Sequence, residues 1–231
     1  MSSDFTGRGI PAEKLRPLGI PVRLDFSDDT ITKDRARETL NLPKDRRTLL
    51  LSGGIHMDGF CDTADALSSH QPAERKREIL KDSHAGAFAV ISFGMYMLGY
   101  FAFSSELELC YNTALIMGLM HMISRAVGAL MSTLTVSAHE GLLSAFTSAG
   151  AKGAAWILLC IFALCAAGVI LIAGIGGAAM VIAAVMAFFA LRRMAIKQFG
   201  GMSGDLAGFS IQMSELIMLT AYVFVTKAVN I

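Results

Sequence analysis

The longest apolar stretch of this chain is GAAWILLCIFALCAAGVILIAGIGGAAMVIAAVMAFFAL, residues 153–191, and it contains no charged residue. A helix that crosses a bilayer needs about 20 predominantly apolar residues, so this stretch is long enough to cross twice. Glycines at its middle allow a tight turn between two helices. The pattern therefore predicts a membrane hairpin made of residues 153–173 and 175–191.

Three further segments have the length and composition of membrane-crossing helices: residues 86–103, 109–134 and 212–230. Together with the hairpin they predict an all-α, polytopic membrane bundle with about five transmembrane helices. Charged residues make up only 17% of the chain and become scarce after Asp82. We therefore expect a short soluble segment, residues 1–52, followed by a membrane domain, residues 53–231.

The distribution of cations predicts the orientation of this bundle. Three cations follow the hairpin, whereas the 104–108 link carries acids and no cation. Cytoplasmic flanks of membrane helices are enriched in Lys and Arg. We therefore expect residues 192–211 on the cytoplasmic side, together with the polar segments 53–85 and 137–152, and the C-terminus on the other side.

Composition also excludes several classes of function. A formal net charge of +1 gives no reason to expect a nucleic-acid partner. The four cysteines form no CxxC pair and no Cys/His metal spacing, so neither a disulfide framework nor a zinc site is expected. The N-terminus lacks the apolar core of a signal peptide.

The strongest chemical signal is GGIHMDGFCDTADAL, residues 53–67. Asp58, Asp62 and Asp65 follow one another at i, i+4 and i+7, which places them on one stripe of a helix. Such carboxylates repel each other unless a cation lies between them, and Mg²⁺ takes oxygen ligands from carboxylates and substrate phosphates. We expect Mg²⁺ and a pyrophosphate here; the alternative is an ordinary exposed acidic helix face. Glycines of this stretch leave room for a ligand: Gly53, Gly54 and Gly59.

Two other polar segments have both a structural and a functional interpretation. Residues 74–86 alternate charges as a solvated helix face does, but Lys81 lies at the membrane edge, where a cation can meet a phosphate. Residues 200–215 combine glycines with the Ser203 hydroxyl, and Asp205 begins the last span. For this segment a ligand site and a simple helix cap, followed by a snorkelling acid, are equal alternatives.

Arg125 interrupts the second span. An arginine near the middle of a bilayer costs about 2.5–3.5 kcal/mol on insertion scales. We therefore expect it to face the bundle interior and to meet an acid or a phosphate. His121 lies one turn earlier on the same face, where a satisfied core histidine is more common than a ligand.

These motifs together resemble those of the cobalamin synthase (adenosylcobinamide-GDP ribazoletransferase) family. The first motif is matched by Gly53, Gly54, His56, Asp58, Gly59, Asp62, Thr63 and Asp65. The later motifs are matched by Lys81, Asp82, Ser83, Gly86, Ser124, Arg125, Gly200, Gly201, Gly204, Asp205 and Glu215. Ser203 replaces a usual threonine but keeps the hydroxyl, and His84 replaces a common arginine.

The resemblance implies an Mg²⁺-dependent transferase in the bacterial plasma membrane, with a cytoplasmic active site. Its substrates would be adenosylcobinamide-GDP and α-ribazole or α-ribazole 5′-phosphate. It implies metal binding by Asp58, Asp62, Asp65 and Asp205, charge neutralisation by Lys81 and Arg125, and proton removal by His56 or one of the acids. Substrate binding is implied for Gly53, Gly54, Gly59, Asp82, Ser83, Gly201, Ser203 and Gly204. It leaves a homo-oligomer open.

The N-terminal part has a different resemblance. Residues 8–54 are similar to the interdomain stretch of two-domain glycosyltransferases that act on diacylglycerol or peptidoglycan precursors. They stand where the cobalamin synthase family has one or two membrane helices, which suggests a fusion. An inactive fused membrane module and, less well supported, a glycosyltransferase fragment are therefore alternatives to an active transferase. We expect residues 1–48 to contribute nothing to the site.

Overall fold

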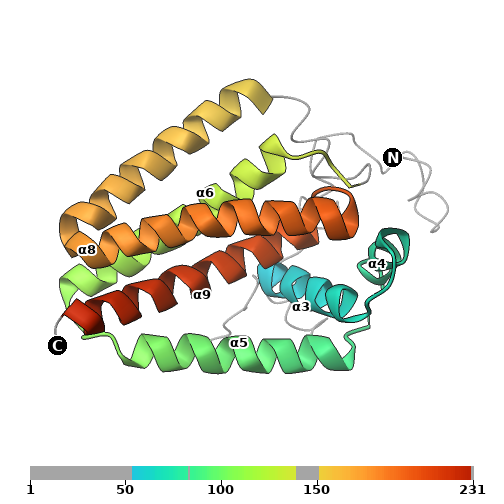
Figure 1. The fold of residues 1–231 in the computed structure, drawn as a ribbon, viewed down its shortest axis with the longest axis horizontal. Coiled ribbons are helices and arrows are strands. Elements are labelled where there is room, and N and C mark those ends of the chain that lie inside the picture. The colour runs from blue at the N-terminus through green and yellow to red at the C-terminus, as the bar shows by residue number, and fades with distance from the viewer. Residues whose placement is uncertain (1–53, 83, 139–150, 230–231) are drawn as a thin grey trace, which may run out of the picture. The chain divides into compact units, whose positions relative to one another are not determined.

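The computed structural model describes residues 54–82, 84–138 and 151–229, which belong to one compact unit, Gly53–Ile231. The expected soluble segment 1–52 and the glycosyltransferase-like stretch lie outside the described residues, except for Gly54. Within the described ranges the chain is helical, apart from one isolated bridge between Ser137 and Met202. The helices are α3 (Ile55–Ser68), α4 (Ala73–Ile79), α5 (Ala87–Ser105), α6 (Tyr111–Leu134), α8 (Ala151–Phe199) and α9 (Gly204–Val229) (Figure 1).

Four of these helices are long and apolar enough to cross a membrane: α5, α6, α8 and α9. Helix α8 is not straight, because Gly174 has φ 55° and ψ −125°, and the chain turns back at this point (Figure 1). A positive φ of this kind favours glycine. The two limbs of α8, residues 151–173 and 175–199, are the expected hairpin, so the prediction of about five membrane helices is confirmed.

A second glycine holds the two limbs of α8 together. A Cβ atom at Gly177 would lie 2.3 Å from the Val169 carbonyl oxygen on the opposite limb, closer than real Cβ atoms come. The limbs therefore touch backbone to backbone just after the turn. The Gly176-Gly177 pair is visible in the sequence, but the sequence does not show that Gly177 contacts Val169 on the opposite limb.

Helix α9 is the centre of the bundle, since it packs against α3, α5, α6 and α8. It buries apolar side chains along most of its length, including Leu206, Met218 and Leu219. By contrast, α5 and the first limb of α8 expose most of their apolar side chains. Exposed apolar side chains on long helices fit contact with lipid, in agreement with the expected membrane location.

The close contact inside α8 gives a testable prediction. Gly177→Ala should lower the melting temperature of the detergent-purified protein, because overpacking in a well-packed region costs about 1–3 kcal/mol. The matched control is Gly118→Ala on α6, where an added Cβ meets nothing within 4 Å. Equal melting temperatures for the two variants would show that the limbs do not touch at Gly177.

Candidate active site

The candidate site is built on a close contact between α3 and the start of α9. A Cβ at Gly59 would lie 2.7 Å from both the Cα and the carbonyl oxygen of Asp205. A Cβ at Gly208 would lie 2.9 Å from the carbonyl oxygen of His56. One glycine on each helix thus lets the two backbones meet, and Asp205 comes to lie beside the middle of α3. In this structure Gly59 is buried and makes room for α9 rather than for a ligand.

The acids of this region act on one another electrostatically. Asp62 is half-buried, and its carboxyl has a pKa raised to about 6. Burial is the largest cause, followed in order by the nearby charges of Asp58, Asp205, Asp65 and Asp82. The tertiary structure has therefore gathered acids from α3, from the start of α9 and from the segment after α4 around Asp62.

Asp65 has a structural task at the start of α5. Its Oδ2 accepts a hydrogen bond of 2.5 Å from the Gly86 backbone N–H, and its Oδ1 accepts one of 2.8 Å from the Ala89 N–H. A carboxylate that accepts the first N–H groups of a helix caps it and opposes its dipole. Because both oxygens bind backbone N–H groups, the structure uses Asp65 to hold α5 against α3.

One ion shared by all three acids of the stripe stays a prediction, since both oxygens of Asp65 are engaged at the start of α5. Among the described residues, no group of three or more His, Cys, Asp or Glu side chains is placed to hold one metal ion. However, Mg²⁺ is commonly bound by one or two carboxylates, with water and substrate phosphates as the other ligands. The repulsion centred on Asp62, with Asp58 and Asp205 as the strongest charges around it, fits a partial site of that kind.

The segment after α4 is exposed. Asp82 Oδ1 accepts a hydrogen bond from the His84 backbone N–H at 3.1 Å and lies 2.7 Å from His84 Nδ1, and these bonds lower the pKa of Asp82. Lys81 is exposed and makes no ion pair within the described part of the chain. Two expected substrate-binding residues, Gly53 and Ser83, lie outside the described residues.

Helix α4 is more than a solvated face. Arg75 and Glu78 form an exposed pair, as the charge pattern suggested. Lys76, however, is buried and donates a hydrogen bond of 2.5 Å to Gln198 Oε1. Arg77 donates one of 2.8 Å to the Phe199 carbonyl oxygen, at the C-terminal end of α8, where a cation is favourable. The sequence does not predict these contacts, because a pattern of alternating charges along a helix does not show which of its cations contacts another helix.

The glycine-rich loop before α9 is held by the end of α6. Gly201 has φ 156°, and a Cβ there would lie 2.3 Å from the Val136 carbonyl oxygen. Met202 donates its N–H to that oxygen at 2.9 Å, and the Ala138 N–H bonds back to the Met202 carbonyl at 2.8 Å. The buried Ser203 Oγ then accepts the Leu206 N–H at 3.2 Å and caps α9.

These contacts support the structural interpretation of the loop. Gly201 and Ser203 position Asp205, which lies in the first turn of α9. Gly204 begins that helix, and a Cβ at this position would meet nothing within 4 Å. Of the three expected substrate-binding residues in this loop, Gly204 alone offers open space.

A second polar group lies deeper in the bundle. The buried Glu215 carboxylate accepts a hydrogen bond of 2.8 Å from Ser124 Oγ and forms an ion pair with Arg125. The expectation that Arg125 meets an acid is therefore confirmed. Glu215 does not snorkel, and it lies ten residues, or about 15 Å along the helix, from Asp205.

His121 is a satisfied residue of this polar group. Its Nδ1 donates to the Met117 carbonyl oxygen at 2.6 Å, so the neutral ring accepts the Tyr100 hydroxyl at Nε2, 3.2 Å away. Phe60 of α3 stacks on Phe209 of α9 with ring centroids 5.4 Å apart. Arg125 is paired with Glu215, but its side chain is 47% exposed, so the bundle does not enclose it.

Comparison with known proteins gives a consistent result. Residues 47–223 match the family described as cobalamin-5-phosphate synthase. An adenosylcobinamide-GDP ribazoletransferase of Lachnoclostridium phytofermentans is 39% identical over 171 residues, which cover 73% of this chain and 65% of the relative. Relatives of the same name from Clostridium botulinum and Pseudomonas fluorescens are each 34% identical, over 68% and 70% of their lengths. No solved structure matches.

Asp65 supplies the first prediction for the site. Asp65→Ala should destabilise the detergent-purified protein by about 1 kcal/mol, the usual effect of losing a helix cap, and Asp65→Asn by less because an acceptor oxygen remains. Asp58→Ala, an exposed acid on the same helix, is the control and should not destabilise. Equal losses in thermal unfolding for Asp65→Ala and Asp58→Ala would refute the capping role.

The ion pair between Arg125 and Glu215 gives a second prediction for this region. Arg125→Met leaves the Glu215 carboxylate buried without its cation and should cost about 3 kcal/mol, at the low end for a broken buried pair because Arg125 is half-exposed. Adding Glu215→Gln should recover much of this loss. As a control, Lys227→Met breaks the exposed pair with Glu106 and should change little. No recovery in the double variant would mean that the pair does not hold α6 to α9.

Proposed function

The chain belongs to the cobalamin-5-phosphate synthase family, and from this we propose that it transfers the adenosylcobinamide phosphoryl group of adenosylcobinamide-GDP to α-ribazole or α-ribazole 5′-phosphate. The resemblance expected for residues 53–231 is confirmed by the match over residues 47–223. The chain spans 65–70% of the length of the relatives compared above, so the activity named for them is proposed rather than assigned. The observation that carries the proposal is the gathering of Asp58, Asp62 and Asp205 by the α3–α9 contact.

In the proposed reaction a ribazole hydroxyl attacks the cobinamide-linked phosphorus. The bond between this phosphorus and the bridging oxygen breaks, and GMP leaves with that oxygen. Phosphoryl transfer of this kind depends mainly on positioning and charge neutralisation. We propose that one or two of the carboxylates of Asp58, Asp62 and Asp205 would hold Mg²⁺, together with water and pyrophosphate oxygens. The ion would neutralise charge on the pyrophosphate when bound.

Residues around these acids have further proposed roles. Lys81 supplies a second positive charge, and its exposure leaves it able to reach a phosphate. The attacking hydroxyl would lose its proton to His56 or to one of the acids. His56 lies on the first turn of α3, half-buried against α9. Asp62 has a pKa of about 6, close enough to neutrality for its carboxyl to exchange a proton at physiological pH.

Asp62→Asn tests this proposal. Membranes containing the full chain would be assayed for cobamide formation from adenosylcobinamide-GDP and α-ribazole across an Mg²⁺ titration. Asn keeps the shape but loses the charge, so we expect turnover to fall about 10²–10³-fold while insertion is unchanged. Glu108→Gln, an exposed acid in the link between α5 and α6, is the control and should behave as the wild type.

Two outcomes would contradict the assignment. Near-wild-type turnover for Asp62→Asn at modest Mg²⁺ would make Asp62 an ordinary surface acid. No turnover by either protein, with normal insertion, would favour a membrane module without activity.

We also propose that the acids face the cytoplasm. Lys76 and Arg77 bond to the end of α8, so the cations at positions 192, 193 and 197 belong to the same end of the bundle as α4. At the opposite end, Lys227 Nζ lies 2.6 Å from Glu106 Oε2, so the link after α5 and the end of α9 should share one side. Reporter fusions at Ser104 and Ile231 should both be external. An internal signal at Ser104 would reverse this orientation.

A further inference from the structure

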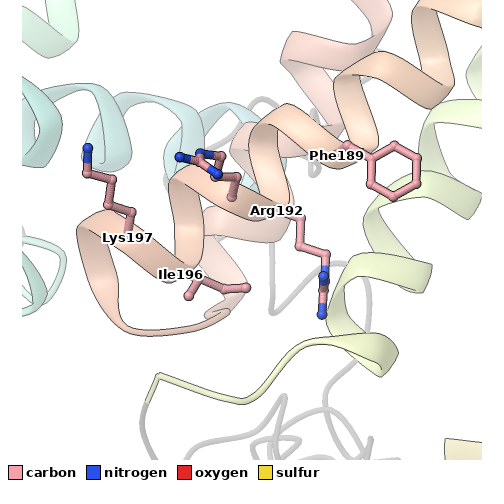
Figure 2. Close-up of a pocket in the computed structure, with 5 residues that line it drawn as sticks. Phe189, Arg192, Ile196 and Lys197 are labelled. Carbon is pink, nitrogen blue, oxygen red and sulfur yellow. The ribbon is translucent and has the colours of Figure 1, made fainter.

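A cationic hollow opens beside the C-terminal end of α8 (Figure 2). Its volume is about 560 Å³, and its walls are Phe189, Arg192, Arg193, Ile196 and Lys197. Three of these residues are cations, two are apolar, and none is an acid. None of them is among the residues assigned to the candidate active site.

Arg192 is held in position by the end of α6. Its Nε donates to Thr135 Oγ1 at 3.1 Å, and its Nη2 donates to the Leu134 carbonyl oxygen at 3.2 Å. In Figure 2 its side chain extends in a different direction from that of Lys197. The bonds fix the guanidinium before any ligand arrives, which reduces the entropy that a bound anion must overcome.

The other two cations add positive charge that no acid among the described residues pairs with. Arg193 and Lys197 are exposed, and neither forms an ion pair in the described part of the chain. The hollow therefore concentrates positive charge that an anion can neutralise. A phosphate group is the anion best suited to a guanidinium with free N–H groups beside an ammonium.

The apolar side chains of the hollow favour the phosphate of a phospholipid over a free phosphate. Phe189 is 62% exposed and Ile196 45% exposed, and both lie near the end of a helix long and apolar enough to cross a membrane. A free phosphate gains nothing from such side chains. A phospholipid places its phosphate at this depth and its glycerol and first acyl carbons beside it, so the apolar wall and the cations are used together.

We propose that this hollow binds the headgroup of an anionic phospholipid. Arg193 and Lys197, one helical turn apart and both exposed, contact the phosphate. Arg192 adds positive charge from the side of the hollow next to α6. Phe189 and Ile196 contact the glycerol and acyl region. Occupancy ties the end of α8 to the membrane surface. That end also receives Lys76 and Arg77 from α4, so lipid binding stabilises the part of the bundle from which the glycine-rich loop leaves.

The full chain, purified and delipidated in detergent, would be titrated with fluorescent phosphatidylglycerol and, separately, with phosphatidylcholine. Phosphatidylglycerol should bind more tightly and raise the melting temperature, and added salt should weaken its binding. Arg193→Gln and Lys197→Gln should each weaken it about fivefold, the factor that corresponds to about 1 kcal/mol per cation. Arg75→Gln removes an equal charge from the exposed face of α4 and should change nothing. Arg192 is left intact because it also holds α6.

Competition with inorganic pyrophosphate separates a lipid site from a site for soluble phosphates. Pyrophosphate should not displace phosphatidylglycerol. Phe189→Ala should weaken the binding of phosphatidylglycerol and leave the binding of pyrophosphate unchanged. The proposal is overturned if the two lipids bind equally, if both Gln variants bind phosphatidylglycerol as the wild type does, or if pyrophosphate displaces the lipid at equal concentration.

Discussion

The structure depends first on the backbone contact between α3 and α9, made possible by Gly59 and Gly208. A side chain at either position would push the helices apart, since the added carbon would lie less than 3 Å from backbone atoms of the other helix. Helix α9 is the centre of the bundle, so whatever packs against it is placed relative to everything else. The same contact brings Asp205 to the acids of α3. Two residues without side chains therefore decide whether acids far apart in sequence come together.

The polar residues next to these acids serve mainly to hold the helices that carry them. Asp65 fastens the start of α5, Ser203 fastens the start of α9, and Arg77 fastens the end of α8. Each binds backbone groups that have no partner inside their own helix. A site at the edge of a membrane needs this arrangement, because helix ends there must be satisfied while the acids between them repel one another. The raised pKa of Asp62 comes first from burial and then from this repulsion, and the repulsion favours binding of a cation.

Polar residues inside the spans follow the rule that buried charge must be paired. Glu215 lies in the bundle with both Ser124 and Arg125 on it, and His121 shares bonds with Tyr100 and Met117. These bonds link α5, α6 and α9. Apolar packing alone would do little to determine which of these helices lie next to one another. The aromatic rings of Phe60 and Phe209 stack where α3 meets α9. The Ser124-Arg125 motif therefore has a structural role, which is to join α6 to Glu215 of α9.

The sequence by itself determined the features that depend on local spacing: the apolar spans, the hairpin at Gly174, the helix that carries Asp58 and Asp62, and the need of Arg125 for an acid. Helical periodicity and the cost of charge in a bilayer act within a single segment, so they can be read without knowing its neighbours. Tertiary structure decided which partner each polar group met. It brought Asp65 to the start of α5, buried Lys76 against α8, and placed Gly59 against α9. Those choices depend on which helix faces which, and that is set by packing between segments distant in sequence.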